Sequence, residues 1–227
     1  MRKIETLLLD AGGVLVVPNW TRVSEVLERC GVSVAASALK DAEPAVKFAI
    51  DTFVGVSSTS DARRWGDYLE GVLTTAGVPL GGATLDALRE IRAYHAANNL
   101  WEEVPPDVVP ALERIRRLGL KVAVASNANG TVHRAFDRLG LSRYFDAICD
   151  SHFEGVEKPQ PRFFEIVLER CGGRPETTLH VGDLYHVDIV GARNTGLTAI
   201  LLDRYDQYAE FDVERIRTLG ELVDRLG

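Results

Sequence analysis

After Pro105-Pro106 the chain alternates single helices with short apolar strands, and this alternation limits the possible folds more than any other feature. The strands are predicted at residues 120–125, 147–149, 178–181 and 198–202. The helices are predicted at residues 108–118, 131–139, 161–170, 187–194 and 219–226. Strands that are separated by single helices pair in parallel through right-handed crossovers. The pattern therefore predicts an α/β fold with a doubly wound parallel sheet.

The first predicted strand, Ile4–Asp10, is separated from the later strands by a long helical stretch. Apolar residues recur there with helical spacing in four segments, at residues 21–30, 35–51, 60–76 and 84–97. We expect an all-α helical cap at residues 18–98, inserted after the first strand into an α/β core of residues 1–17 and 99–227. Open α/β sheets bind ligands at the carboxyl edge of their strands, so the functional site is expected at that edge.

The composition is that of a globular protein and argues against several other classes. Of the 227 residues, 46% are hydrophobic and 26% are charged, and no apolar run approaches the roughly 20 residues that cross a bilayer. The formal net charge of −7 offers no basic surface, so we expect neither nucleic acid nor a membrane as partner. Three cysteines without metal-binding spacing indicate buried, reduced thiols and a cytoplasmic protein. A monomer and a homodimer both remain open.

Distinctive polar residues follow the predicted strands. Singly, each has an ordinary structural explanation, such as a turn, a helix cap or a solvated lysine. Because the carboxyl ends of parallel strands share one edge, these residues are expected to converge there. They are Asp10, Ser126, Asn127, Lys158, Asp183 and Asp188.

The segments that carry these residues resemble the four motifs of the haloacid dehalogenase-like hydrolase superfamily. Leu8–Leu15 resembles the first motif, Val124–Asn127 the second, Gly155–Pro159 the third and His180–Ala192 the fourth. The match spans the core and includes the point where the helical segment is inserted. It implies a Rossmann-like core and the subgroup of the superfamily that has a helical cap.

The resemblance also implies a metal site and a nucleophile. By its motifs, Asp10 is the nucleophile that forms an aspartyl-phosphate. Mg²⁺ is implied as the cofactor, held by Asp10, the backbone carbonyl of Gly12 and Asp183. Asp188 is the fourth residue of this metal site, where it would hold a metal-bound water or pair with Lys158. Three clustered carboxylates would repel one another strongly without a cation, which gives this expectation a physical basis.

The same resemblance implies a phosphate site and a phosphorylated substrate. Ser126, Asn127 and Lys158 would bind the phosphate, with Lys158 as a positive point charge. Ser126 and Lys158 join Asp10 as the catalytic set. The expected reaction is hydrolysis of a small phosphorylated metabolite.

One position departs from the family pattern. Gly12 stands where phosphatases of this superfamily usually carry an aspartate as general acid and base. Its carbonyl can hold a metal, but it cannot transfer a proton, a function that typically contributes about 10²–10⁴-fold to a rate. Another group such as His186 or His95 could replace it, or the substrate could have a good leaving group. Alternatively, the protein is a catalytically weak phospholigand-binding or interaction protein.

Two other activities of the superfamily do without the second aspartate. In a haloacid dehalogenase, Asp10 would form an ester with a carbon substrate, but those enzymes lack the pattern Gly182-Asp183…Asp188. Phosphonate-cleaving relatives use a cap lysine, for which Lys40 and Lys47 are the candidates. The sequence favours the Mg²⁺-dependent phosphatase over both.

Overall fold

The computed structural model describes residues 3–53 and 60–227. The chain divides into two compact units: unit 1 contains residues Met1–Val17 and Glu103–Gly227, and unit 2 contains Pro18–Glu102. The second division falls a few residues beyond the boundary at 98/99 expected from the sequence, within the strand β3 (Trp101–Glu103).

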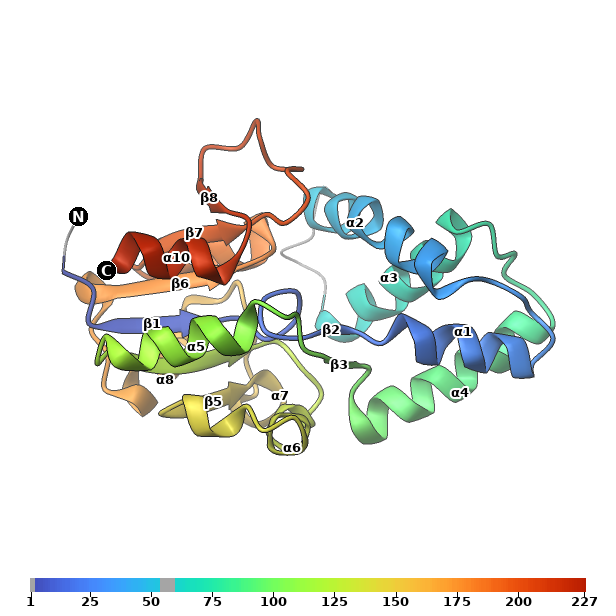
Figure 1. The fold of residues 1–227 in the computed structure, drawn as a ribbon, viewed down its shortest axis with the longest axis horizontal. Helices are drawn as coiled ribbons and strands as arrows, with labels where there is room; N and C mark the ends of the chain where they lie inside the picture. The colour runs from blue at the N-terminus through green and yellow to red at the C-terminus, as the bar shows by residue number, and fades with distance from the viewer. Residues whose placement is uncertain (1–2, 54–59) are drawn as a thin grey trace. The chain divides into compact units, whose positions relative to one another are not determined.

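Unit 1 is built on a six-stranded sheet in the order β5-β4-β1-β6-β7-β8, in which every neighbouring pair is parallel (Figure 1). The four residues of β1 are all buried, as expected for a central strand covered on both faces. This sheet confirms the predicted doubly wound α/β fold. Its strands are β1 (Thr6–Leu9), β4 (Lys121–Ser126), β5 (Ala147–Asp150), β6 (Thr178–Gly182), β7 (Thr198–Leu202) and β8 (Glu214–Ile216).

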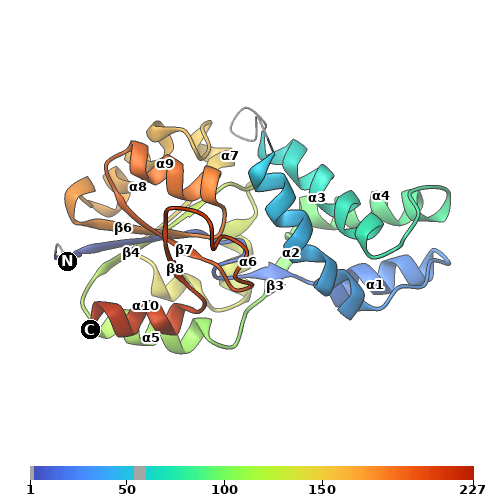
Figure 2. The ribbon, with the colours of Figure 1, turned by 90° about the horizontal axis from the view of Figure 1, so that it is seen from above.

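Helices cover both faces of this sheet. Figure 2 shows α5 and α10 on one face and α8 and α9 on the other. The short helices α6 and α7 follow β4 and β5 in the chain. The bounds are α5 (Val108–Arg117), α6 (Val132–Arg138), α7 (Ser151–Glu154), α8 (Pro161–Cys171), α9 (Val190–Asn194) and α10 (Leu219–Leu226).

The sheet and helices of unit 1 differ from the sequence prediction at the short helix α7, which was not predicted, and in two further places. The edge strand β8 was not predicted, because only one of its three residues is buried and its polar residues carry no strand signal. The helix predicted at 187–194 begins as a π-helical turn, Tyr185–Ile189, before α9. Such turns are rare and often lie at functional sites.

In the part of unit 2 that the structure describes, four helices surround a core of their own. They are α1 (Trp20–Arg29), α2 (Ala36–Thr52), α3 (Asp61–Thr75) and α4 (Ala83–Asn98). The amphipathic α1 places Val23 and Leu27 in this core, where they meet Leu69 and Leu88 from later helices. None of the helices that the structure describes, in either unit, has the length and apolar character needed to cross a membrane.

The chain enters and leaves unit 2 along a small two-stranded sheet. In it β2 (Val17–Pro18) pairs with β3. The next residues continue the pairing, since the Asn19 N–H donates a hydrogen bond to the Leu100 carbonyl at 3.0 Å. The two ends of unit 2 therefore lie side by side.

The three cysteines are free thiols. Cys149 and Cys171 are buried, and burial raises the pKa of Cys149 to about 12. Cys30, at the end of α1, is only half-buried, so the prediction of three buried thiols was wrong for this residue.

Candidate active site

The register of the three central strands brings the motif residues to one edge of the sheet. Leu9 pairs with Val124 in β4 and with Val181 in β6. Asp10 follows β1 directly, and its N–H donates to the Val181 carbonyl at 2.9 Å. The carboxyl ends of β4 and β6 therefore lie at the same edge of the sheet as Asp10.

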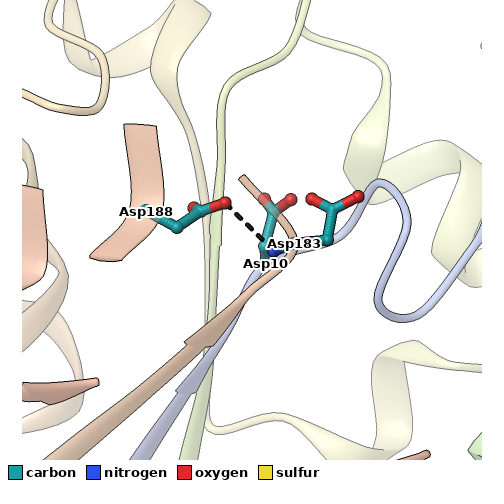
Figure 3. A group of neighbouring side chains, drawn as sticks. All are labelled: Asp10, Asp183 and Asp188. Carbon is teal, nitrogen blue, oxygen red and sulfur yellow. Dashed lines mark hydrogen bonds between the residues drawn. The ribbon is translucent and has the colours of Figure 1, made fainter. Parts of the chain in front are cut away.

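Three aspartates meet at this edge (Figure 3). One carboxylate oxygen each from Asp10, Asp183 and Asp188 lies within 4.8 Å of the others. All three residues are buried. The convergence predicted from the strand ends is thus present for the carboxylates.

Two glycines create the space that these carboxylates occupy. A Cβ at Gly13 would lie 1.7 Å from Oδ2 of Asp183, and Gly13 has a φ of +73° that favours glycine. A Cβ at Gly182 would lie 2.2 Å from the carboxyl carbon of Asp188. The sequence indicated only a loop at Gly13, because nothing in it shows which side chain will approach.

Lys158 joins two of the aspartates. Its Nζ lies 2.6 Å from Oδ1 of Asp10 and 2.7 Å from Oδ1 of Asp188. The lysine is 1% exposed, so these ion pairs lie in a medium that screens them little. Burial acts to lower the pKa of Lys158, but the charges of Asp10 and Asp188 outweigh it and raise the pKa above its ordinary range.

Asp188 accepts hydrogen bonds on both of its oxygens. Oδ1 accepts a hydrogen bond from Nζ of Lys158 and also lies 3.2 Å from Nε2 of His180. Oδ2 receives the backbone N–H groups of Asp183 (3.2 Å) and Leu184 (3.0 Å). Burial acts to raise the pKa of Asp188, but the charge of Lys158 and the hydrogen bond with His180 hold it well below its usual range. Asp188 is therefore ionised and anchored in place.

His180 was not among the residues predicted for the site. It lies in the middle of β6 and is fully buried, and burial lowers its pKa, so the imidazole is neutral. The signal that could have identified it is a titratable residue inside a mostly apolar strand, two residues before Gly182 and three before Asp183.

Asp10 differs from Asp188 in its ionisation. Burial, with added repulsion from Asp188 and Asp183, raises the pKa of Asp10 to about 8, although Lys158 opposes the shift. The single ammonium of Lys158 thus pairs with the carboxyl groups of Asp10 and Asp188, and the carboxylate of Asp183 lies beside them. A bound divalent cation would restore the Asp10 anion, and buried carboxylate oxygens are the ligands that Mg²⁺ prefers. The residues present thus fit a magnesium ion.

The two predicted phosphate ligands of the second motif have different surroundings. Ser126 is the last residue of β4 and is buried. Asn127 uses its side chain on Lys158: Oδ1 accepts from the Lys158 N–H at 2.8 Å, and Nδ2 donates to the Lys158 carbonyl at 2.9 Å. The amide of Asn127 therefore holds the backbone of the lysine, and its predicted contact with phosphate stays a prediction.

Gly12 lies in the turn after β1, where it forms a bridge with Val16. It brings no side chain to the carboxylates. His186 lies in the π-helical turn, and its ring packs against Tyr185 at 5.1 Å and Phe211 at 6.3 Å between centroids.

His95 belongs to unit 2. Its ring stacks on Trp65 with centroids 4.5 Å apart, and Nδ1 accepts a hydrogen bond from the Leu100 N–H at 3.1 Å. Burial lowers the pKa of His95 to about 4, so it is neutral at pH 7. These contacts fix the ring within unit 2, and a role of His95 in proton transfer stays a prediction.

Comparison with known proteins identifies the family. The model of the haloacid dehalogenase-like hydrolase family matches residues 4–196. The chain belongs to this family, as the four motifs indicated.

Individual relatives point to phosphatases. A glyceraldehyde 3-phosphate phosphatase of Methanopyrus kandleri is 32% identical over 59% of this chain and 62% of its own length. A phosphatase of Mycobacterium tuberculosis is 28% identical over 99% of both chains. The chain spans less than two thirds of the first of these proteins.

Solved structures confirm the fold alone. A magnesium-bound HAD-hydrolase of Bacillus subtilis matches with a TM-score of 0.71 and 17% identity over 99% of both chains. Both a phosphatase and an L-2-haloacid dehalogenase are among the similar structures. Structural likeness therefore does not choose between these two activities.

Proposed function

We propose that this chain is a Mg²⁺-dependent phosphatase that hydrolyses small phosphorylated metabolites through an aspartyl-phosphate on Asp10. The observation that carries the proposal is the buried ion-pair cluster, in which Lys158 bridges Asp10 and Asp188 beside Asp183. The sugar phosphate in the name of the Methanopyrus kandleri relative suggests phosphorylated sugars as the substrate class.

The roles of the cluster follow from its contacts. Asp10 attacks phosphorus, so that a bond forms between its Oδ and phosphorus while the bond from phosphorus to the leaving oxygen breaks. Lys158, already 2.6 Å from Asp10, would neutralise charge on the phosphoryl oxygens. Water then hydrolyses the aspartyl-phosphate, which releases inorganic phosphate and regenerates Asp10. The Ser126 hydroxyl would donate a hydrogen bond to the phosphate.

Asp10 and Asp183, with the carbonyl of Gly12, would hold the metal. When bound, Mg²⁺ would neutralise the negative charge of the phosphoryl group and its carboxylate ligands. Asp188 already accepts four hydrogen bonds, so we assign it to anchoring Lys158 and to indirect contact with the metal.

The absence of an acid at Gly12 restricts the proposal. The leaving oxygen needs little protonation when its own pKa is low, as in an acyl or aryl phosphate. The same feature supports the second candidate, a phospholigand-binding protein that barely turns its ligand over. Of the two, the close contact between the Lys158 ammonium and Asp10 favours catalysis.

The position of unit 2 in the chain supports a role for it in specificity. It is inserted between β1, which precedes the nucleophile, and the rest of unit 1. We propose it as the cap of this hydrolase.

The test is hydrolysis of p-nitrophenyl phosphate with and without Mg²⁺, followed from the first turnover. We expect Mg²⁺-dependent release of p-nitrophenol that Asp10→Asn reduces by about 10⁴-fold or more, because the nucleophile is lost. A burst of one equivalent followed by a stall would show that Asp10 is phosphorylated and that Gly12 limits dephosphorylation.

Neither burst nor turnover would overturn the phosphatase proposal. Phosphate binding that survives Asp10→Asn would then identify the binding protein. Release of halide from 2-chloropropionate would identify a dehalogenase instead.

A further inference from the structure

We propose that Asn127 is a positioning residue, whose side-chain amide fixes the backbone of Lys158 and thereby aims the Lys158 ammonium at Asp10 and Asp188. For its effect on rate, this inference rests on the proposed phosphatase function. Its effect on the lysine itself does not depend on that function.

The contact is a two-point match between one amide and one residue. The Asn127 oxygen accepts from the Lys158 N–H at 2.8 Å, and the Asn127 nitrogen donates to the Lys158 carbonyl at 2.9 Å. An asparagine amide carries both an acceptor and donors, so it can satisfy both backbone groups of a residue at once. Two simultaneous hydrogen bonds fix orientation as well as distance.

The contact also joins two separate parts of the sheet edge. Asn127 follows β4 directly, whereas Lys158 lies beyond β5 and α7. Lys158 is buried to its tip, so its backbone needs a partner within the protein. The amide of Asn127 supplies this partner for both the N–H and the carbonyl.

The two ends of Lys158, its ammonium and its backbone, are held by different residues, and this matters for catalysis. Its ammonium end is held only by Asp10 and Asp188 among the contacts described. When Asp10 bonds to phosphorus, the ion pair with Asp10 must weaken. The backbone end held by Asn127 then remains as the fixed point of a flexible four-carbon side chain. Misplacement of a charged group by about 1 Å can cost on the order of 10² in rate.

The first test observes the Lys158 ammonium by ¹H–¹⁵N NMR in metal-free, substrate-free protein. The chain has five lysines, and Lys158→Met assigns the signal. In the wild type we expect a protected signal, because the ammonium is buried and paired. In Asn127→Ala the signal should shift and exchange faster with water. A signal that is unchanged in this variant would overturn the proposal.

A second variant at Asn127 and a control variant at Asn129 complete this test. Asn127→Asp keeps an acceptor for the Lys158 N–H but sets an oxygen against the Lys158 carbonyl, so it should shift the signal even where Asn127→Ala does not fold. Asn129→Ala is the matched control: it lies in the same loop, and its oxygen accepts from the Thr131 hydroxyl at 2.5 Å. An equal shift in Asn129→Ala would mean a general loop effect and would overturn the specific role.

The second test is a double-mutant cycle on kcat/KM with p-nitrophenyl phosphate and Mg²⁺. Asn127→Ala should lower kcat/KM by roughly 10-fold and Lys158→Met by roughly 1,000-fold, and the double variant should fall no further than Lys158→Met alone. Multiplied losses would show that Asn127 acts independently of the lysine and would overturn the proposal. If the wild type has no turnover, the proposed function fails, while the ammonium signal still decides the role of Asn127.

Discussion

The carboxylates of the two units differ in their surroundings: those of the unit 1 cluster are buried, whereas Glu43 in unit 2 is only half-buried. In unit 1, Asp10 and Asp188 share one ammonium, and burial, with added repulsion from Asp188 and Asp183, raises the pKa of Asp10. In unit 2, Glu43 accepts hydrogen bonds from the Trp20 indole and the Tyr68 hydroxyl, both at 2.8 Å. Both of these donors are neutral groups.

Glu102 in unit 2 is also held by hydrogen bonds, here from a neutral hydroxyl and from a charged guanidinium. Burial acts to raise its pKa, but hydrogen bonds from Tyr94 and Arg22 hold the pKa below its ordinary value. Internally satisfied carboxylates of this kind connect helices. A carboxylate cluster short of positive charge, as in unit 1, is instead suited to bind a cation and an anionic substrate. Burial together with unbalanced negative charge separates the candidate site from these scaffold carboxylates.

The largest expected effect tests whether the ion pairs of unit 1 are needed for its stability. Lys158→Met leaves Asp10 and Asp188 without their ammonium, which should destabilise unit 1 by about 3–5 kcal/mol in EDTA. Added Mg²⁺ should recover part of the loss if the carboxylates bind it. Hydrogen exchange of β1 and β6 measures unit 1.

Tryptophan fluorescence supplies the reference, because all three tryptophans, Trp20, Trp65 and Trp101, lie in unit 2. Its unfolding transition should stay in place in Lys158→Met. If it moves as far as the exchange in β1, the two units do not behave separately and the comparison fails.

The next effect contrasts two glycines that share a left-handed backbone. Gly13→Ala in unit 1 should cost about 2–4 kcal/mol, because the new Cβ meets Asp183 at a positive φ. It should also weaken Mg²⁺ binding, measured by calorimetry. Gly31→Ala in unit 2 has a φ of +84° but open space around the Cβ, so it should cost only about 1 kcal/mol. Equal costs would mean that the carboxylate contact has no effect.

A smaller effect tests the scaffold role of Glu43. Glu43→Ala leaves the indole of Trp20 and the hydroxyl of Tyr68 without their acceptor, which should destabilise unit 2 by about 1–3 kcal/mol. Urea unfolding followed by tryptophan fluorescence measures this loss. Glu43→Gln keeps one acceptor and should lose less. Unchanged Mg²⁺ binding in both variants is the accompanying control.

The smallest effect is a pH dependence in unit 2. The folded pKa of His95 is about 4 against an ordinary 6.5, so the unfolded chain binds the proton more tightly. The stability that neutral His95 provides is present above pH 6.5 and is lost as the pH falls toward 4. Between pH 7 and 5 the loss should be about 1–2 kcal/mol in the fluorescence transition. His95→Gln should flatten this dependence, and an equal slope in that variant would contradict it.

The sequence predicts the fold and the convergence of the carboxylates with Lys158, because both follow from the order of strands and the shared edge of a parallel sheet. It does not predict that Asn127 binds the backbone of Lys158, or that His180 faces Asp188. Those contacts depend on side-chain direction between segments that are distant in the chain. The strand β8 escapes prediction for another reason, since three mostly polar residues carry no periodic signal.

The pairing of β2 with β3 reduces the entropic cost that the insertion of unit 2 adds to the folding of unit 1. An inserted segment imposes a loop-closure entropy that grows with the length of chain between its ends. Here the hydrogen bond from Asn19 to Leu100 already holds those ends together, and the core of unit 2 is made of its own residues. Once unit 2 is folded, the connection that follows β1 is therefore equivalent, in its loop-closure entropy, to a short hairpin. Sequence in this segment can thus diversify widely while β1 still pairs with β4 and β6.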